Sequence, residues 1–409
     1  MRDIIFVSLE NWDDVWRRNQ FLCSTLARRY PAMKILFVGL SFNVSHHLLH
    51  GSLRKLRGPM SWTVPGFPNI TVIHTLKLFP DSLSTGRKIN EWIARFQIQR
   101  LARRLGIADA ILWLNPHSSV HMTRTMGEHC VIYDITDDWT LQPSLSSSER
   151  RIAEEQDRAL CERADLVVVC SEALLKSRRH LSQSIALIPN GVDVKHYESV
   201  QTRPESRSWT APVFGYTGTL HSERTDARLI IDLARAFPNG SVLLIGPDHW
   251  TGTDRKLIAA ERNIHMHGAV PYSKIPELMA QFDVCIVPHV ETKFTDSLNP
   301  IKLWEYLASG KPIVATNIAG FRDYAHFCRI ASGSDAFVAA CSAALTDRDN
   351  LSSKRISEAR HHTWDARVDA LLTILEDLRW ISPDRPVGAI PSPDNQQVGA
   401  GNNYPDTGR

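Results

Sequence analysis

Short apolar segments rich in β-branched residues alternate with helix-length segments along most of this 409-residue chain. Such alternation is typical of a parallel sheet that is covered by helices on both faces. We therefore predict an α/β fold with two doubly wound, Rossmann-like domains. The expected strands of the first domain lie at residues 3–8, 34–39, 69–74, 109–114, 130–135, 165–170 and 185–189, and those of the second at 213–218, 241–246, 263–268, 283–288 and 312–316. Open α/β sheets bind ligands at the carboxyl ends of their strands, so we expect the two domains to face a central cleft.

The domain limits are predicted from polar, Pro-containing segments that separate the apolar ones. A first domain is expected at residues 1–200, a linker at 201–212 and a second domain at 213–363. The apolar helix expected at 364–381 can cross back to the first domain. The tail at 382–409 is rich in Pro, Gly, Asn and Asp, which predicts disorder.

The composition is that of a globular protein, with 43% hydrophobic and 22% charged residues. No apolar run approaches the ~20 residues that a membrane span needs, and the N-terminus lacks the pattern of a secretory signal, so we expect a cytoplasmic protein. The seven cysteines are scattered and show no spacing of a metal site. They are predicted to be reduced packing residues, and no metal ion is expected.

The positive charge is concentrated in the first third of the chain. Residues 1–130 contain 17 Lys and Arg against 8 Asp and Glu, a net charge of +9. This asymmetry suggests an anionic partner: an acidic membrane surface, a phosphorylated substrate or a nucleic acid. A nucleic acid is disfavoured because no known binding module accompanies the charge. The segment 85–105 predicts a basic amphipathic helix, which is compatible with an anionic membrane surface. An ordinary packed helix with a charged rim is favoured over this, because any α/β domain needs such helices.

Two opposite charges interrupt an otherwise apolar helix in the segment "NPIKLWEYLASGKP", residues 299–312. Lys302 and Glu305 lie one turn apart, and a mutual i,i+3 ion pair would stabilise the helix by only about 0.2–0.5 kcal/mol. Burying both charges costs more than that, which indicates a ligand. The turn "GYTGTLHSERTD", residues 215–226, could bind an anion, because its glycines and the following helix N-terminus favour one. Alternatively, it is only a tight turn between a strand and a helix.

Several motifs between residues 185 and 318 occur together in a recognisable order. They are "PNGVD" (189–193), "GYTGTL" (215–220), "SVLLIGP" (241–247), "VPYSKIPELMAQFDVCIVPH" (270–289) and "NPIKLWEYLASGKPIVAT" (299–316). In this order the chain resembles GT-B glycosyltransferases of group 1 (family 4), of the type found in bacterial exopolysaccharide or teichuronic acid synthesis. The resemblance implies a GT-B fold, with an acceptor-binding first domain and a nucleotide-sugar-binding second domain.

The resemblance also implies roles for residues of the second domain. Glu305 would accept hydrogen bonds from the donor's ribose hydroxyls, and Lys302 would contact the diphosphate. Gly218 and Thr219 would help to hold the nucleotide. Ser297 occupies the position where many relatives carry a first glutamate, so the resemblance does not fix the stereochemical outcome. The donor would be a UDP- or GDP-type nucleotide sugar, a substrate, and no further cofactor is expected.

A catalytic base is expected in the first domain, after the strand "CVIYDI". Asp134, Asp137 and Asp138 are predicted to reach the cleft there, and an inverting transfer needs a group to take the acceptor's hydroxyl proton. One of Asp137 and Asp138 could be the base and the other an N-cap, or both could only cap the loop. His117 is a second candidate for the base or for binding a hydroxyl.

Aromatic and basic residues follow the first strand in the segment "ENWDDVWRRNQF". Trp16, Arg17 and Arg18 could stack on a sugar or contact a phosphate of the acceptor. Alternatively, Trp16 and Phe21 pack inward and the arginines are solvated.

We expect a cytoplasmic, metal-independent, hexosyltransferase-like enzyme that works in surface or exopolysaccharide synthesis and can lie peripherally on the inner face of the cell membrane. It would transfer a sugar from a nucleotide diphosphate to a glycan or lipid-linked acceptor. Two alternatives are a nucleotide-sugar epimerase of the same fold and a degenerate, non-catalytic homologue that serves as a binding subunit.

Overall fold

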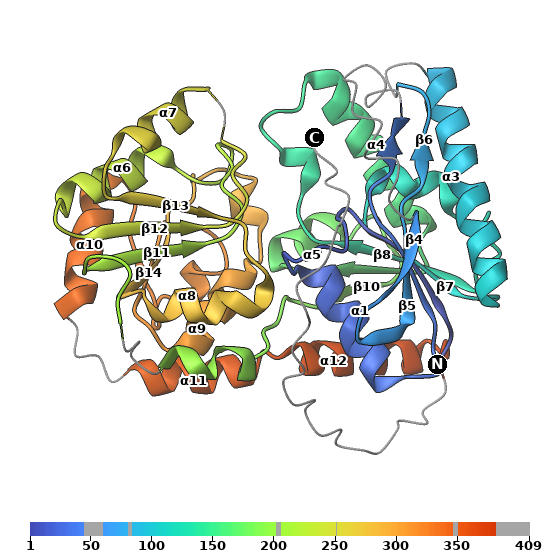
Figure 1. Ribbon diagram of the computed structural model, residues 1–409. Coiled ribbons are helices and arrows are strands. Elements are labelled where there is room, and N and C mark those ends of the chain that lie inside the picture. Colours follow the sequence, from blue (N-terminus) through green and yellow to red (C-terminus); the bar gives the residue numbers. More distant parts are fainter. Residues whose placement is uncertain (45–59, 81–83, 202–205, 251, 347–350, 382–409) are drawn as a thin grey trace.

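The computed structural model describes residues 1–409 except 45–59, 81–83, 202–205, 251, 347–350 and 382–409 (Figure 1). The predicted disordered tail and residues 202–205 of the predicted linker therefore lie outside the described residues. The described residues form two separate sheets, and a two-stranded ribbon accompanies the first (Figure 1).

The first sheet has eight strands in the order β10-β9-β8-β7-β1-β2-β5-β4. Only the β4–β5 pair is antiparallel. The strands are β1 (Ile4–Val7), β2 (Ile35–Val38), β4 (Ser61–Val64), β5 (Phe67–Ile73), β7 (Ile111–Leu114), β8 (Cys130–Ile135), β9 (Leu166–Val169) and β10 (Ile185–Leu187), with the ribbon β3 (Phe42–Asn43) and β6 (Leu76–Lys77) beside them. The helices are α1 (Arg18–Arg29), α3 (Ser84–Leu105), α4 (Ser147–Arg163) and α5 (Glu172–Arg178), with short 3-10 helices η2 (His117–Met122), η3 (Trp139–Leu141) and η4 (Lys195–Gln201).

The second sheet has six parallel strands in the order β13-β12-β11-β14-β15-β16. They are β11 (Val213–Thr217), β12 (Ser241–Ile245), β13 (Ile264–Gly268), β14 (Val284–Val287), β15 (Ile313–Ala315) and β16 (Arg329–Ile330). The helices are α6 (Ala227–Ala236), α7 (Gly252–Ala260), α8 (Ile275–Ala280), α9 (Ile301–Ser309), α10 (Ser334–Thr346) and α11 (Leu351–Arg360), with short 3-10 helices η5 (Tyr272–Lys274), η6 (Thr295–Ser297) and η7 (Arg322–Tyr324).

Both faces of each sheet are covered, as the apolar strands predicted. Along β1, Ile4 and Phe6 join the core on one face, while Ile5 and Val7 join the core on the other. Alternate residues of a strand point to opposite faces, so a strand buried on both sides must be apolar throughout. The second sheet is likewise packed between two apolar cores. The predicted α/β fold class with two doubly wound sheets is confirmed.

The last described helix, α12 (Trp364–Asp377), packs against the first sheet's core and not the second's. Its apolar residues recur at helical spacing, so that Trp364, Val368 and Leu372 share one buried face. The Trp364 ring stacks on Phe21 of α1, with centroids 4.8 Å apart. The end of the described chain therefore completes the core of the domain that its beginning forms (Figure 1).

The predicted domain limits stay predictions, although the first sheet ends at Leu187 and the second begins at Val213. None of the described helices combines the length and the apolar character needed to cross a bilayer.

Candidate functional site

The carboxyl ends of the two sheets meet, and polar side chains cross between them. Asp137 follows β8 in the first domain, and its Oδ2 lies 3.3 Å from a guanidinium nitrogen of Arg224, which follows β11 in the second. The Ser171 hydroxyl, after β9, donates to the carbonyl of Ser297, after β14, over 2.6 Å. The backbone N–H of Asn190 donates to Asn299 Oδ1 over 2.8 Å. Loops after strands of both domains thus form one candidate site.

Lys302 and Glu305 are half-buried on α9, whose other side chains pack inward. Burial lowers the pKa of Lys302 to about 8, although the charge of Glu305 opposes the shift. Burial also raises the pKa of Glu305, and Lys302 opposes that shift. No direct ion pair joins the two side chains in the described part of the chain, so both charges are left with incomplete solvation.

The turn after β11 is shaped around the Lys302 side chain. Gly218 has φ +146°, a conformation that L side chains rarely adopt, and a Cβ there would overlap Lys302 Cε, so a larger residue would strain the backbone and displace the end of the lysine. The Lys302 ammonium lies 5.7 Å from the centre of the Tyr216 ring. The Tyr216 hydroxyl donates to the carbonyl of Thr219 over 3.5 Å. The structure therefore brings together Gly218, Thr219 and Lys302.

Two tyrosines border Glu305. The Tyr197 hydroxyl lies beside the carboxylate without a well-formed hydrogen bond, and its proximity lowers the pKa of Glu305 against the effect of burial. The negative charge of Glu305 adds to burial in raising the pKa of Tyr272. The phenols of Tyr197 and Tyr272 are thus neutral, and the Glu305 carboxylate beside them is the acidic group at this place.

The same Tyr272 contacts the first domain. Trp16 stacks on it, with centroids 5.7 Å apart and planes 17° from parallel, and Phe21 meets it edge-on at 5.1 Å. The alternative in which Trp16 and Phe21 pack inward is therefore confirmed. Its second half is wrong for Arg18, which is only 3% exposed.

Arg18 is the buried partner of Asp134. Its Nε lies 3.2 Å from one carboxylate oxygen, and Trp113 Nε1 donates to the same oxygen over 3.2 Å. Asp134 is 0% exposed. The prediction that Asp134 reaches the cleft is wrong, because the carboxylate neutralises a buried arginine beneath it.

Asp138 has a similar buried role. Arg178 donates to its Oδ1 over 2.7 Å, and the Thr140 hydroxyl donates to the same oxygen over 2.6 Å. Asp138 stands at the N-cap position of η3, but its side chain makes no capping hydrogen bond to the backbone. Of the two neighbouring carboxylates, Asp137 is the one that faces the second domain.

Asp137 lies in a mixed electrostatic environment. Burial raises its pKa, and the opposing charges of Arg224 and Lys302 lower it. His117, the other predicted candidate, begins η2 after β7. Its Nδ1 lies 3.0 Å from Gln156 Oε1 of α4.

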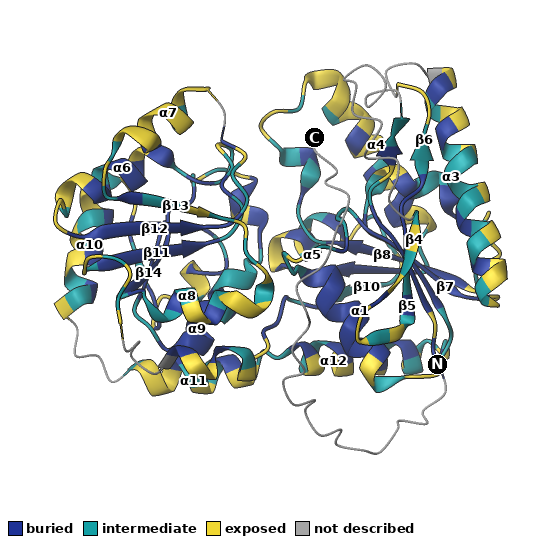
Figure 2. Cartoon of the chain, viewed as in Figure 1, coloured by how far each residue is buried: buried dark blue, intermediate teal, exposed yellow. Residues whose placement is uncertain are grey.

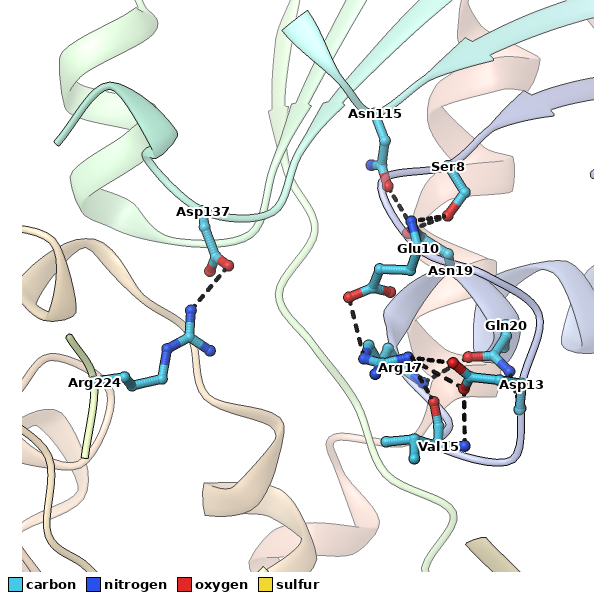
Figure 3. Close-up of polar contacts among 10 residues, drawn as sticks. All are labelled: Ser8, Glu10, Asp13, Val15, Arg17, Asn19, Gln20, Asn115, Asp137 and Arg224. Atoms are coloured by element: carbon cyan, nitrogen blue, oxygen red, sulfur yellow. Dashed lines mark hydrogen bonds and ion pairs between the residues drawn. The ribbon is translucent and has the colours of Figure 1, made fainter. Parts of the chain in front are cut away.

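Glu10 is a candidate that the sequence reasoning missed. It follows β1 by three residues, and burial raises its pKa to about 7, against the opposing charge of Arg17 and with a contribution from Asp137. Arg17 Nε lies 3.4 Å from Glu10 Oε1. Figure 3 shows each of the two carboxylates directed at its own arginine, Glu10 at Arg17 and Asp137 at Arg224. The sequence offers one indication of Glu10, which is the first acidic residue after β1.

Ser297 is committed to local structure. Its hydroxyl donates to the Phe294 carbonyl over 2.7 Å within η6, and the residue is 5% exposed. Ser297 is thus a turn residue where the two domains meet. The centre of the neighbouring Phe294 ring lies 5.5 Å from the guanidinium carbon of Arg224.

Residues 211–347 match the family described as "Glycosyl transferases group 1". This range contains Gly218, Thr219, Arg224, Lys302 and Glu305. This part of the chain is similar to the group 1 glycosyltransferases. The resemblance inferred from the sequence motifs is therefore confirmed for this part of the chain.

A curated relative extends the match. The putative teichuronic acid biosynthesis glycosyltransferase TuaH of Bacillus subtilis is 26% identical over 202 residues, which make up 46% of this chain. The alignment spans about half of that relative, 50% of its length.

Solved structures match nearly the whole chain. Sucrose-phosphate synthase from Thermosynechococcus elongatus superposes with a TM-score of 0.69 and 16% identity, covering 93% of this chain and 100% of the other. Anabaena HepE in complex with UDP and glucose gives a TM-score of 0.65 at 16% identity, with 93% and 100% covered. At this identity the likeness shows the fold alone. The group 1 domain and its partner domain together have the GT-B fold.

Proposed function

We propose that this protein is a glycosyltransferase that moves a sugar from a UDP- or GDP-type nucleotide sugar to a glycan or lipid-linked acceptor in surface polysaccharide synthesis. Support comes from the group 1 domain and from the teichuronic acid name of the relative. A solved structure of the same fold holds UDP-glucose.

The observation that carries the proposal is the pair Lys302 and Glu305. Both lose hydration on α9 without pairing directly, so a ligand with complementary charge and hydroxyls would repay the cost. Glu305 suits ribose hydroxyls as an acceptor. Lys302, Arg224 and the N-terminus of α9 supply positive charge for a diphosphate. We propose that these groups stabilise the leaving diphosphate without a metal ion.

The reaction needs one proton acceptor in the first domain. The acceptor's hydroxyl oxygen would attack the anomeric carbon, the bond from that carbon to the diphosphate would break, and a carboxylate would take the hydroxyl proton. Among the described residues, we propose Asp137 and Glu10 as the candidate proton acceptors. Glu10 has the better matched basicity, since a base works best with a pKa near the operating pH, and its pKa is about 7. Asp137 is held by Arg224 until a diphosphate competes for that arginine.

The donor is tested first by thermal melting with UDP, GDP and ADP. A ligand at 100 times its dissociation constant should contribute about 2.7 kcal/mol to stability. The reaction is then tested with sugar donors built on the nucleotide that raised the melting temperature, by measuring transfer of the sugar to a soluble glycan acceptor. A new nucleotide sugar formed without acceptor would indicate the epimerase, and nucleotide binding without turnover would indicate the non-catalytic homologue.

The base is tested with Glu10→Gln and Asp137→Asn. Either change should leave nucleotide binding at least as tight, and the one that removes the base should lower turnover by about 10²–10⁴-fold. Asp13→Asn is the matched control, because Asp13 lies in the same loop and also pairs with Arg17. Full turnover in both variants would move the role to His117 or to a retaining reaction without this base.

We also propose a cytoplasmic location, peripheral to the membrane. All seven cysteines are free and buried in the described structure, as in proteins of a reducing compartment.

A further inference from the structure

An exposed apolar cluster lies on the first domain, far along its surface from the candidate site. Five large hydrophobic side chains there are unusually exposed: Leu78 (40%), Phe79 (41%), Ile89 (39%), Trp92 (60%) and Phe96 (46%). Only Ile152 and Leu257 are comparable elsewhere in the described residues. Large apolar side chains gathered in one place indicate an interaction surface, whereas scattered ones do not.

Helix α3 exposes an apolar stripe to solvent, whereas a helix that only packs on its domain exposes polar residues. Ile89, Trp92 and Phe96 follow an i, i+3, i+7 spacing, so they share one side, and the Trp92 and Phe96 rings stack with centroids 5.8 Å apart. The inward side carries Ile98 and Ala102, which are buried. The expectation of an ordinary packed helix is therefore wrong for the aromatic residues of α3, since they do not join the core.

The loop before α3 is fixed beside this stripe. Asn90 accepts from the backbone N–H groups of Leu78 and Phe79 over 2.9 and 3.1 Å, and it donates to the Phe79 carbonyl over 2.8 Å. These bonds hold the two exposed loop residues against the N-terminal half of α3. The five side chains therefore form one surface. We call this surface, together with the exposed cations Lys88, Arg100, Arg103 and Arg104, the apolar-basic face.

Exposed cations surround the apolar side chains. Residues 84–105 carry six Lys and Arg against the single acid Glu91. Four of these cations are exposed: Lys88, Arg100, Arg103 and Arg104. Arg100 and Arg103 continue the outward stripe one and two turns beyond Phe96. Figure 1 shows α3 on the outer flank, away from the second domain, and Figure 2 shows exposed residues recurring along it.

We propose that the apolar-basic face docks the protein on an anionic lipid bilayer. Aromatic rings favour the boundary between acyl chains and headgroups, and adjacent Lys and Arg are attracted to acidic lipids. A second copy of the chain is a poorer occupant, because an isologous contact would place these cations against one another. The docking rests on and extends the proposed function, since it would bring the protein to the bilayer that carries lipid-linked acceptors, but it requires no donor and no catalysis.

The test is flotation of the full-length protein with vesicles of phosphatidylcholine alone or mixed with phosphatidylglycerol. We expect binding to the mixed vesicles only, and loss of binding as 1 M salt shortens the screening length to about 3 Å. Trp92→Ser with Phe96→Ser, and Arg100→Gln with Arg103→Gln and Arg104→Gln, should each reduce binding by about tenfold or more. Leu257→Ser, which removes an equally exposed side chain from α7, should not.

Melting temperatures and transfer to a water-soluble acceptor should be unchanged in all these variants, because the substituted side chains are exposed. That readout separates failure of the docking from failure of the proposed function. Equal binding to both kinds of vesicle, binding to neither, or an equal loss with Leu257→Ser would overturn the proposal. So would sedimentation showing a dimer that Trp92→Ser with Phe96→Ser dissolves, which would assign the face to self-association.

Discussion

Lys302 and Glu305 give up hydration on α9 without a direct ion pair to offset the loss. Burial lowers the pKa of Lys302 and raises the pKa of Glu305, so it favours the neutral form of each side chain. A helix selected only for stability would carry apolar or fully solvated residues at these positions. The arrangement is therefore best explained by a ligand that completes the solvation of both groups, and two predictions follow from this residue pair.

Glu305→Ala should weaken binding of the preferred nucleoside diphosphate by roughly 1.5–3 kcal/mol, the usual range for hydrogen bonds to a charged group. Isothermal titration calorimetry measures the change. Glu277→Ala is the control, because Glu277 is an exposed acid on α8 whose partner is Lys274. Unchanged affinity in Glu305→Ala would remove this residue from the donor site.

The affinity for a nucleoside diphosphate should fall as pH rises through about 8. Burial lowers the pKa of Lys302 to about 8 in the free protein, and only the protonated amine attracts a diphosphate. With a pKa of about 8, the protonated fraction falls by about tenfold between pH 7 and pH 9, and affinity should fall with it. Lys302→Arg keeps the charge and should flatten the profile. A flat profile in the unaltered protein would show that this lysine does not contact the nucleotide.

At the scale of elements, α12 is decisive because it belongs to the first domain's core although the second domain precedes it in the chain. Thr363 begins the helix by accepting a hydrogen bond from the Ala366 N–H over 3.1 Å. Arg29 of α1 also pairs with Asp365 over 3.2 Å. The interface with α1 is thus both apolar and charged, and it ties the chain's two ends together.

Leu372→Ala should lower the free energy of unfolding by about 2–5 kcal/mol, because Leu372 is 0% exposed in the core between α12 and the first sheet. Urea denaturation measures the loss. Asp377→Ala, at the exposed end of the same helix, should change stability by less than about 0.5 kcal/mol. Equal effects of the two changes would mean that α12 is not docked.

At the scale of the whole molecule, the two domains are joined by more than a linker. Tyr272 contacts Trp16 and Phe21, and its backbone N–H donates to the Asp14 carbonyl over 3.0 Å. Asp137 and Arg224 add a charged contact across the site. Together with α12, these contacts should couple the stability of one domain to that of the other.

We therefore expect a single thermal transition, and a nucleoside diphosphate bound to the second domain should shift all of it. Calorimetry should give one peak, and tryptophan fluorescence and far-ultraviolet circular dichroism should report the same midpoint. Two peaks, of which the nucleotide moves only one, would show that the domains unfold independently.

Local sequence was sufficient for most strands of the two sheets, and it drew attention to the pair on α9. It did not predict β4 and β16, the edge strands of the two sheets, or the short ribbon of β3 and β6. A strand buried on both faces is expected to be apolar, and β1, β2 and β9 are apolar at every position. Lys302 and Glu305 stood out because charges on an apolar helix conflict with burial whatever the tertiary structure. The glycine at 218 was likewise expected to admit a close approach, although not of Lys302 itself.

The remaining features depend on which residues meet across long separations in the chain. Asp134, Asp137 and Asp138 are neighbours in sequence, yet Arg18 and Arg178 bury the first and the last, and only Asp137 faces Arg224. Glu10 became a candidate because its burial and its neighbours raise its pKa, neither of which a single segment specifies. The tertiary structure also turned Trp92 of α3 outward, since helical spacing identifies a face but not the side on which the core lies.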